Sequence, residues 1–301
     1  MVIDNTDLLV CPLCRSSVKF ESNNLVCLNC NKIYPIENEI GILVPNPVEH
    51  LNFIESQIKS EKKDWYVSDQ IEAYDKGPYR FHLKKRIDFV EKFIQSHLKQ
   101  IDNNKIILDM GCGDGVNLRW LSKYSQNLLA IDYNLLRLRR TRQLMRTLKV
   151  SAKLFLADIF YIPFANDSFD LIFFNHVIEH LNDDFLALKN IYRITKKGGI
   201  VILGTPNEGA LSWGFAYWIE PMTRKKTDHV HFYTAKSISE LALKAGFTIK
   251  HIEYMGWGIP IWSLDSRIRK YKIIDDLFEL IGKRLFKSQS TSLYIILEKP
   301  I

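Results

Sequence analysis

The sequence predicts an α/β protein in which a parallel sheet carries helices on both faces and a small cysteine-rich segment precedes it. Three observations support this fold class. From residue 105 onward, short apolar runs alternate with helical stretches, which is the order that builds a parallel sheet. A glycine-rich loop follows the first apolar run, and two C-x-x-C pairs lie within the first 30 residues.

The first strand of the predicted sheet is the apolar run 105–108, which continues through Asp109 into Gly111, Gly113 and Gly115. Glycine lets the backbone turn sharply and approach a ligand without a Cβ in the way. Free N–H groups at the start of the following helix favour a negatively charged ligand group. The G-x-G-x-G spacing differs from the G-x-G-x-x-G of dinucleotide-binding loops. The loop therefore predicts a cofactor site of another kind.

Polar residues end the next apolar runs of the sheet. Asp132 and Asp158 close the second and third runs, with Tyr133 and Ile159 directly after them, and Asn175 closes the fourth. An acid at the end of the second strand can accept both ribose hydroxyls of a nucleoside. The predicted strands are 105–109, 127–132, 152–157, 169–175, 198–204, 248–254 and 292–299.

In this order and spacing, the motifs resemble those of the class I S-adenosylmethionine-dependent methyltransferases. Asp109 and its glycine loop resemble motif I, and Asp158 followed by residues 162–164 and 167–170 resembles the "D…LPF…SFD" signature. Residues 175–181 resemble the "VLEHL" motif of the ubiquinone/menaquinone-type branch. The resemblance implies a doubly wound, Rossmann-like sheet of seven strands in the order 3-2-1-4-5-7-6.

The same resemblance implies S-adenosylmethionine as the cofactor, with Asp158 holding the adenine amino group. A Rossmann-like core for another nucleotide is the alternative. The residues expected to bind the cofactor are Asp109, Gly111, Gly113, Gly115, Asp132, Tyr133, Asp158, Ile159 and Asn175.

Four of the five cysteines form two C-x-x-C pairs, Cys11 with Cys14 and Cys27 with Cys30. Each pair bends the backbone so that two thiolates converge, and two such pairs make a tetrahedral Zn²⁺ site. Four thiolates leave no open coordination position, so the zinc is predicted to be structural. An iron–sulfur cluster and disulfide pairing are the alternatives.

The sequence around these cysteines resembles the small zinc-ribbon activator of tRNA, rRNA and release-factor methyltransferases. The resemblance rests on residues 8–14, 32–36 and 41–45 and covers about the first 45 residues. A ribbon of this kind either recognises the substrate or serves only as a folding module, and both interpretations stay open.

The predicted organisation has three parts. These are a zinc-ribbon domain over residues 1–46, a linker with N-terminal lid helices over 47–104, and a methyltransferase domain over 105–301. The aromatic residues Trp65, Tyr66, Tyr74 and Tyr79 either belong to a lid over the cofactor or pack against the first helix.

Composition sets limits on partners and location. The 301 residues carry a net charge of +7, which permits RNA, acidic lipid or a phosphorylated substrate without requiring any of them. The sequence contains no uninterrupted run of 18 apolar residues, so no membrane-spanning helix is predicted. Residues 1–9 lack the basic segment of a secretory signal. The expectation is a cytoplasmic enzyme, and no oligomeric state is predicted.

Two insertions, 207–233 and 256–289, are rich in aromatic residues and are where we expect substrate choice to lie. Within the second, residues 267–287 form a basic amphipathic stretch. Such a stretch either contacts a membrane surface peripherally or covers a protein core. A row of arginines follows the second strand and predicts a solvated helix face or a phosphate-binding patch: Arg137, Arg139, Arg140, Arg142 and Arg146.

A hydroxyl acceptor needs a general base near the methyl group, and histidine suits this task because its pKa lies near neutrality. We select His231 first and His229 second, ahead of His176 and His180. Some quinone-type O-methyltransferases bind a metal through an "E-x-x-E-H" motif. Here His176 replaces the earlier acid, so no catalytic metal is predicted.

Three functions follow from these patterns. The first is a methyltransferase acting on an oxygen or nitrogen of a small-molecule or lipid-linked acceptor. The second is a tRNA or rRNA base methyltransferase that uses the ribbon to recognise RNA. The third is a non-catalytic scaffold, against which the intact acids and glycines of the predicted cofactor site count.

Overall fold

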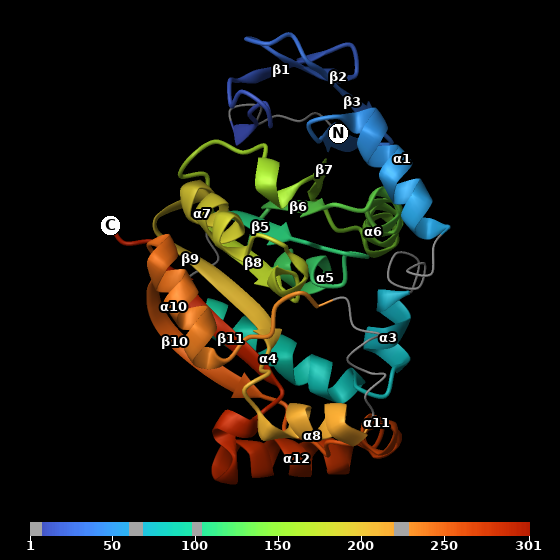
Figure 1. The fold of residues 1–301 in the computed structure, drawn as a ribbon. Coiled ribbons are helices and arrows are strands. Elements are labelled where there is room, and N and C mark those ends of the chain that lie inside the picture. Colours follow the sequence, from blue (N-terminus) through green and yellow to red (C-terminus); the bar gives the residue numbers. More distant parts are fainter. Residues whose placement is uncertain (1–7, 60–68, 98–103, 220–228) are drawn as a thin grey trace. The chain divides into compact units, whose positions relative to one another are not determined.

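The computed structural model describes residues 8–59, 69–97, 104–219 and 229–301 (Figure 1). These residues form two compact units. The first comprises Met1–Gln70, Ile101–Phe173 and Asn190–Gly199, and the second comprises Ile71–Gln100, Phe174–Lys189 and Ile200–Ile301. The predicted lid aromatics Trp65 and Tyr66 lie outside the described residues.

The first unit is a sheet whose strands lie in the order β1-β2-β3-β4-β7-β6-β5. The strands are β1 (Val18–Glu21), β2 (Asn24–Cys27), β3 (Ile33–Glu37), β4 (Ile40–Leu43), β5 (Ile106–Met110), β6 (Asn127–Asp132) and β7 (Lys153–Ala157). The helices are α1 (Pro47–Ile58), α5 (Leu118–Leu121), α6 (Leu135–Leu148) and the 3₁₀ turn η2 (Ile159–Tyr161). Strands β5, β6 and β7 are parallel, with Leu108 opposite Leu129 and Ile131 opposite Phe155.

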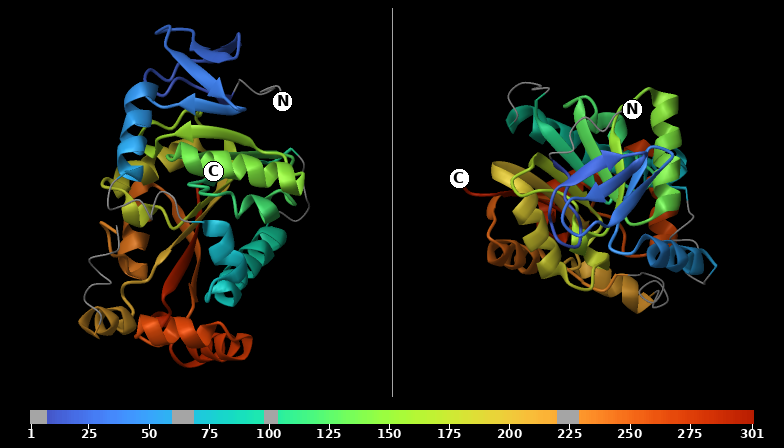
Figure 2. Two further views of the ribbon diagram at one scale, coloured as in Figure 1. Left: turned by 90° about the vertical axis from the view of Figure 1, so that its right-hand side faces the viewer. Right: turned by 90° about the horizontal axis from the view of Figure 1, so that it is seen from above.

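The N-terminal strands continue the sheet of the first unit (Figure 2). Strands β1 to β4 pair antiparallel in sequence order, and β4 pairs parallel with β7, placing Ile42 opposite Leu156. A Cβ on Gly41 of β4 would lie 2.7 Å from the ring of Phe155, so the glycine permits this close packing. Buried on both faces, β4 reads as an unbroken apolar run, as strands of parallel sheets do.

This arrangement corrects the predicted sheet. The described residues contain eleven strands instead of seven, because the N-terminal segment contributes four strands to the edge at β7. The contacts therefore group the cysteine segment with β5–β7 in one unit. The domain boundaries after residues 46 and 104 remain predictions.

The arginine row of α6 also differs from expectation. Arg139 pairs with Glu37, and Arg142 and Arg146 pair with Glu39, so the row binds the turn between β3 and β4. Arg137 is buried and pairs with Asp114. The solvated-face interpretation holds only in part: Arg139 and Arg146 are exposed, whereas Arg137 and Arg142 are buried. These four arginines pair with three acids of the first unit, namely Asp114, Glu37 and Glu39.

Strands β8 (Phe169–Asn175) and β9 (Thr195–Pro206) and helix α7 (Asp184–Ile194) run from one unit into the other. The second unit adds β11 (Ser292–Glu298) and β10 (Thr248–Met255), in the order β9-β11-β10, all antiparallel. Its remaining elements are α3 (Gln70–Lys76), α4 (Arg80–His97), η3 (Ile178–His180), α8 (Leu211–Ile219), α10 (Ala235–Ala245), α11 (Trp262–Arg269), α12 (Lys272–Leu285) and η4 (Lys287–Gln289).

Helix α10 illustrates how local sequence sets these elements. Thr234 and Ser237 form a reciprocal capping box at its start, and Gly246 ends it in a left-handed conformation. Among the described residues, no helix is both long enough and apolar enough to cross a membrane.

Candidate functional site

The glycine loop of the first unit is shaped by three residues with positive φ. Gly111, Gly113 and Gly115 have φ of 77°, 55° and 80°, which side chains with a Cβ rarely adopt. A Cβ on Gly113 would lie 2.1 Å from Oε1 of Gln70, and one on Gly115 would lie 2.7 Å from Cγ2 of Thr141. Glycine is therefore required here by both conformation and space.

Asp132 joins this loop to the end of β6. Its Oδ2 accepts a hydrogen bond from the Gly113 N–H at 2.8 Å, and its Oδ1 accepts one from the Asn134 N–H at 2.8 Å. Burial raises the pKa of the Asp132 carboxyl, and the two backbone donors offset part of that rise. Each carboxylate oxygen has further lone pairs, so the group can still accept hydrogen bonds from a ligand's hydroxyls.

Asp109, at the end of β5, is 1% exposed. Its Oδ2 has no hydrogen-bond partner among the described residues. Burial, followed by the nearby charge of Asp132, raises the pKa of Asp109 to about 8. Buried polar atoms without partners are rare, so this orphaned oxygen suits a ligand that brings a donor or a positive charge.

Tyr133 and Asp158 lie near helix α1. The His50 Nε2–H donates to the backbone carbonyl of Tyr133 at 2.8 Å, and the two rings meet edge to face with centroids 4.2 Å apart. Burial lowers the pKa of His50. Asp158 caps η2 by accepting from the Phe160 N–H at 2.9 Å, and burial raises its pKa. Ile159, the next residue, is buried.

Asn175, the last predicted cofactor residue, is the final residue of β8 and belongs to the second unit. Its Oδ1 has no hydrogen-bond partner among the described residues. A Cβ on Gly204 would lie 2.1 Å from this oxygen, so the glycine leaves the space that Asn175 occupies. Within the first unit, the glycine loop, Asp132 and the orphaned Asp109 oxygen fit a nucleoside cofactor.

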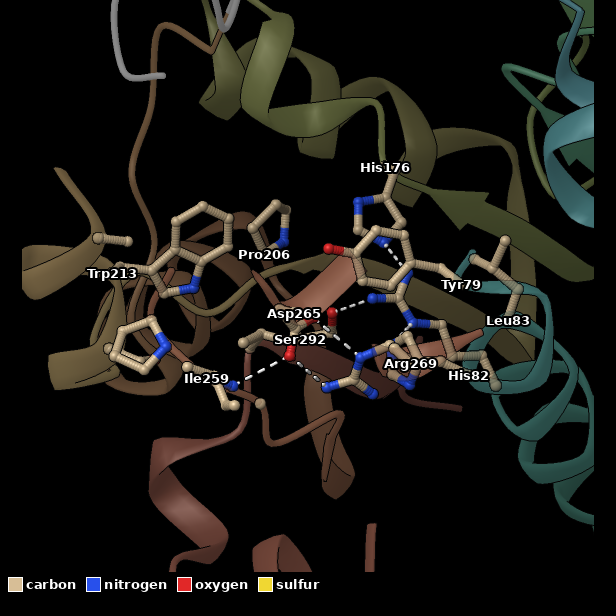
Figure 3. Close-up of a pocket in the computed structure, with 16 residues that line it drawn as sticks. Tyr79, His82, Leu83, His176, Pro206, Trp213, Ile259, Asp265, Arg269 and Ser292 are labelled. Carbon is tan, nitrogen blue, oxygen red and sulfur yellow. Dashed lines mark hydrogen bonds and ion pairs between the residues drawn. The ribbon is translucent and has the colours of Figure 1, made fainter. Parts of the chain in front are cut away.

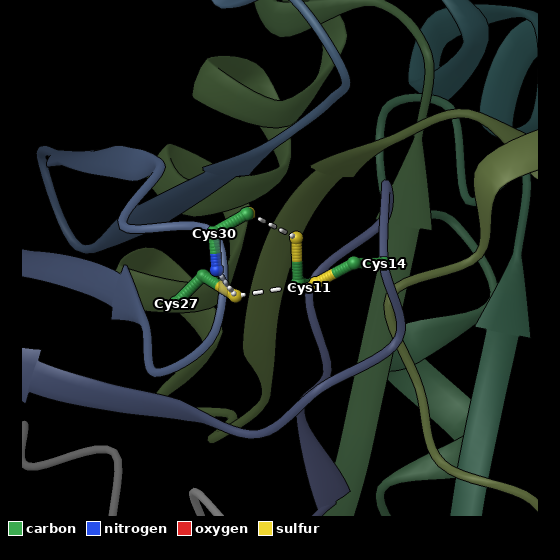
Figure 4. Close-up of side chains that lie close together, drawn as sticks. All are labelled: Cys11, Cys14, Cys27 and Cys30. Carbon is green, nitrogen blue, oxygen red and sulfur yellow. Dashed lines mark hydrogen bonds between the residues drawn. The ribbon is translucent and has the colours of Figure 1, made fainter.

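The four predicted zinc ligands converge in the first unit (Figure 4). The sulfur atoms of Cys11 and Cys30 lie 3.7 Å apart and those of Cys14 and Cys27 lie 3.4 Å apart, and all four lie within 4.8 Å of one another. A tetrahedron with Zn–S distances of about 2.3 Å has sulfur–sulfur edges of about 3.8 Å. The cysteines are free thiols, and their arrangement fits a structural zinc.

Two further contacts shape this cluster. The backbone N–H groups of Asn29 and Cys30 each donate to Sγ of Cys27 at 3.4 Å, as in a metal-binding knuckle. The hydroxyl of buried Tyr34 lies 3.1 Å from Sγ of Cys11. A zinc-bound thiolate only accepts, so with zinc bound the Tyr34 hydroxyl would donate to Cys11 and support this ligand from outside the coordination sphere.

A cavity of about 290 Å³ lies within the second unit, between α4, α8, α11 and the ends of β8 and β9 (Figure 3). Much of its lining is apolar, from Leu83, Pro206, Trp213, Ala216 and Ile259. Its polar lining residues are Tyr79, His82, Arg86, His176, Ser212, Asp265, Arg269, Thr291 and Ser292. An apolar cavity with a few polar groups is the common form of a small-molecule site.

His176 is held in this cavity by two partners. Its Nδ1 lies 3.1 Å from Oε1 of Glu179, and its Nε2 lies 2.9 Å from Nη1 of Arg86. Because arginine only donates, Nε2 accepts and Nδ1 carries the proton that is given to Glu179. Burial lowers the pKa of His176. Its φ of 54° shows that the backbone is strained to place this ring.

Glu179 is a fully buried acid that organises the loop before α10. Burial opposes its ionisation, but the hydrogen bond from His176 brings the pKa of Glu179 below its ordinary value. Its other oxygen accepts from the Thr205 hydroxyl at 3.2 Å. Its backbone carbonyl accepts from the N–H groups of Val230 and His231 at 2.8 and 3.1 Å.

The two predicted bases lie on that loop, and neither lines the cavity. His231 Nδ1 lies 3.7 Å from Oδ2 of Asp184, and its Nε2 has no partner among the described residues. The ring of His229 lies beside that of His180, with centroids 4.9 Å apart. Side-chain atoms of Glu179, His180 and His229 come within 4.8 Å of one another.

A family model described as "Methyltransferase domain" matches residues 82–252, more than half of the chain. The chain belongs to this methyltransferase family. A second model, "Trm112p-like protein", matches residues 6–39, the segment that carries the four cysteines.

Relatives of this methyltransferase include enzymes of quinone metabolism. The 2-methyl-6-phytyl-1,4-hydroquinone methyltransferase of Synechocystis is 26% identical over 184 residues, which cover 59% of this chain and 58% of that protein. The ubiquinone biosynthesis O-methyltransferase of Hydrogenovibrio crunogenus is 27% identical over 199 residues, covering 64% of this chain and 77% of that protein. The chain spans less than two thirds of the first relative's length.

A solved structure shows that the fold is shared. The BH2331 protein of Bacillus halodurans C-125 is 14% identical, with a TM-score of 0.52, covering 68% of this chain and all of that one. At this identity, the likeness concerns the fold alone.

Sequence reasoning missed several residues of both sites. Asp114 is fully buried, accepts from the Gln70 backbone N–H at 2.9 Å and pairs with Arg137 at 3.3 Å. It therefore ties the loop of this methyltransferase to residue 70. Arg86, His82 and Ser292 were missed in the cavity, and only the i,i+4 spacing of the first two within a predicted helix could have drawn attention to them.

Proposed function

We propose that this chain transfers a methyl group from S-adenosylmethionine to an oxygen or nitrogen of a small or lipid-linked acceptor. The observation that carries the proposal is Asp132, a carboxylate held by the N–H of Gly113 and placed at the end of β6 in a chain of the methyltransferase family. When bound, the cofactor supplies a methyl group activated by its sulfonium. Because the transfer is an in-line displacement, holding the reactants in position accounts for much of the rate.

In this proposal, Asp132 accepts the ribose hydroxyls and Asp158 accepts from the adenine amino group. The N–H groups and open space of Gly111, Gly113 and Gly115 receive the rest of the cofactor. Asp109, Tyr133, Ile159 and Asn175 complete the set. The orphaned oxygens of Asp109 and Asn175 support this assignment because each can accept one more hydrogen bond.

We assign the cavity of the second unit to the acceptor. His176, which lines it, directly follows Asn175, a proposed cofactor residue. The chain therefore passes from one proposed site to the other within a single residue. Its apolar lining suits an apolar acceptor, and the quinone-pathway relatives support that class.

His231 is the proposed general base, with His229 second. The carboxylate of Asp184 near Nδ1 of His231 would orient its ring and leave Nε2 to take a proton. His176 is less suited, because its Nε2 already accepts from Arg86.

A peripheral membrane contact is part of the proposal. Helix α12 exposes Ile273, Leu277 and Leu280 at helical spacing, and α8 exposes Leu211, Phe215 and Trp218 in the same way. Both helices lie in the second unit, and α8 also lines the cavity through Trp213 and Ala216. An exposed apolar stripe flanked by lysine and arginine suits an acidic lipid surface, where a lipid-linked acceptor would be found.

The alternative is an RNA base methyltransferase, favoured by the match of residues 6–39 to the Trm112p-like family. The α6 arginines do not support it, since they pair with acids of the first unit.

The test is incubation of the purified chain with methyl-labelled S-adenosylmethionine and separate lipid, small-metabolite and RNA extracts. Labelling of a lipid or small-metabolite fraction that is lost with Asp132→Ala supports the proposal. Labelling of RNA alone would establish the alternative, and an absence of label from every fraction at saturating cofactor would refute both.

A further inference from the structure

Arg86 is a cation that lines the cavity of the second unit and forms no ion pair with an acid among the described residues. It donates from Nε to His82 Nε2 at 2.8 Å, from Nη1 to His176 Nε2 at 2.9 Å, and from Nη2 to the Ser292 hydroxyl. All three partners are neutral acceptors. A partly buried guanidinium is costly without a countercharge, so the cavity holds positive charge that its own contacts do not balance.

Asp265 lines the cavity, Asp275 and Glu179 contact residues that line it, and all three carboxylates have other partners. Asp265 accepts from Arg269 Nε at 3.0 Å and from the Ile259 N–H at 3.0 Å. Asp275 accepts from Arg269 Nη1 at 2.7 Å and pairs with Lys85. Glu179 accepts from His176 and Thr205. None of these carboxylates forms an ion pair with Arg86.

The two imidazoles beside Arg86 do not reduce its charge. Since arginine only donates, each ring accepts on Nε2 and carries its proton on Nδ1. His82 is 4% exposed, and its Nδ1–H finds no acceptor among the described residues. Among the described residues, the cavity therefore contains one cation with no direct ion pair, whose nearest countercharge is Glu179 on the far side of the His176 ring, and one unsatisfied buried donor.

Arg86 also has N–H groups that its described hydrogen bonds do not use. A guanidinium carries five N–H groups, and the described contacts of Arg86 use three of them. The two that remain are on its terminal nitrogens, which is where a carboxylate or phosphate binds most strongly.

We propose that the acceptor of this cavity is an amphipathic anion, whose single oxyanion pairs with Arg86 while its apolar body lies against Trp213, Leu83 and Ile259. Figure 3 shows these side chains around the same space, with Trp213 and Pro206 opposite Leu83 and His82. The proposal rests on the proposed function only in naming this ligand as the acceptor. The oxyanion site itself is a property of the cavity and can be tested without methyl transfer.

The test is calorimetric titration of the full chain with octanoate, octyl phosphate and octanol, which share one alkyl chain and differ in charge. A charge-assisted hydrogen-bonded pair predicts that at least one anion binds about tenfold or more tightly than octanol. The stronger of the two anions identifies the acceptor's group as a carboxylate or a phosphate. Equal affinity of all three compounds would overturn the proposal.

Variants locate the effect. Arg86→Met should bind the anions no more tightly than octanol, and Arg86→Lys should keep part of the preference as a point charge. Lys84→Met is the matched control, because it removes an exposed cation from the same helix, and it should leave the preference unchanged. An undiminished preference in folded Arg86→Met, or an equal loss in Lys84→Met, would refute the assignment to Arg86.

If Arg86→Met does not fold, two other measurements test the oxyanion site. These are the affinities of the wild-type protein for the two anions and for octanol, and the same affinities of Arg86→Lys. Titration with S-adenosylmethionine on the same samples separates the two proposals. Cofactor binding without an anion preference defeats only the oxyanion site, and an anion preference without cofactor binding defeats only the methyltransferase.

Discussion

The glycine loop of the first unit and the cavity of the second unit hold their polar groups by different means. In the first, backbone N–H groups of Gly113 and Asn134 fix Asp132, and positive φ angles shape the loop. In the second, Arg86 is held by His82 of α4, His176 directly after β8 and Ser292 of β11. The first site therefore depends on backbone conformation, and the second depends on the identity of single side chains.

The comparison predicts that the largest losses occur in the first unit, where a metal ligand is removed or the backbone of the loop is strained. The largest effect should come from Cys27→Ser, which removes one of the four clustered thiolates. Metal binding supplies most of the folding energy of such a small ribbon, so this variant should lose zinc and unfold β1–β4. Zinc content and circular dichroism measure the loss.

The matched control is Cys112→Ser, which changes the buried cysteine of the glycine loop and should keep the full zinc content. Equal zinc in the Cys27 and wild-type proteins would show that the four cysteines are not the metal site.

The next largest effect should come from Gly113→Ala. Its φ of 55° and the 2.1 Å approach of its Cβ to Gln70 strain the loop. Strain of about 1–3 kcal/mol should lower the affinity for S-adenosylmethionine about tenfold to a hundredfold. Octanoate affinity in the second unit should not change.

Gly214→Ala provides the contrast, since a Cβ there meets nothing within 4 Å. Gly214 lies in α8, and its replacement by alanine should raise the free energy of unfolding by about 0.5–1 kcal/mol, because alanine favours helix.

For the loop itself, an unchanged cofactor affinity in Gly113→Ala would mean that the loop does not bind the cofactor.

A smaller, pH-dependent effect should distinguish Asp109. The pKa of Asp109 in the folded state is about 8, raised from 3.8 by burial and by Asp132. The folded chain therefore holds this proton more tightly than the unfolded chain does, so its contribution to stability is present below pH 3.8 and is lost as pH rises toward 8.

Asp109→Asn removes that titration, so the wild-type protein should lose stability relative to the variant between these two pH values. Denaturant unfolding at several pH values measures the difference. A constant difference across this range would contradict the burial of an ionisable group at this position.

The smallest effect should come from the surface of α12. Leu277→Ser removes an exposed apolar side chain and should weaken binding to vesicles of acidic phospholipid severalfold, as expected for one leucine in an interface. Leu243→Ser, also exposed but on α10, should have no effect. Equal vesicle binding by the wild type, Leu277→Ser and Leu243→Ser would contradict a membrane contact through α12.

The first unit was largely readable from sequence because its site is local. Asp132 follows a continuous apolar strand, and the glycines follow the strand before it, so residue order alone places them at neighbouring strand ends. The two C-x-x-C spacings likewise predict that the four cysteine sulfurs converge, because each pair is local in the sequence. The addition of β4 to the sheet was missed because its partner, β7, is more than 100 residues away.

The second unit could not be read in the same way. Arg86 and Ser292 are separated by 206 residues, and Arg86 and His176 by 90. No local pattern brings such residues together; only the packing of α4 near β8 and β11 does. Arg139 and Arg146 of α6 show the same limit, since Glu37 and Glu39, which pair with them, lie 102 and 107 residues earlier.

The central claim is that the first unit binds S-adenosylmethionine through Asp132. Calorimetric titration of this compound and of NAD into wild-type and Asp132→Ala protein tests it directly, with Asp88→Asn as an exposed acidic control. We expect the wild type and the control to bind S-adenosylmethionine and not NAD, and Asp132→Ala to bind it about tenfold to a hundredfold more weakly with zinc content unchanged. Undiminished affinity in Asp132→Ala, or binding of NAD in place of S-adenosylmethionine, would contradict the account.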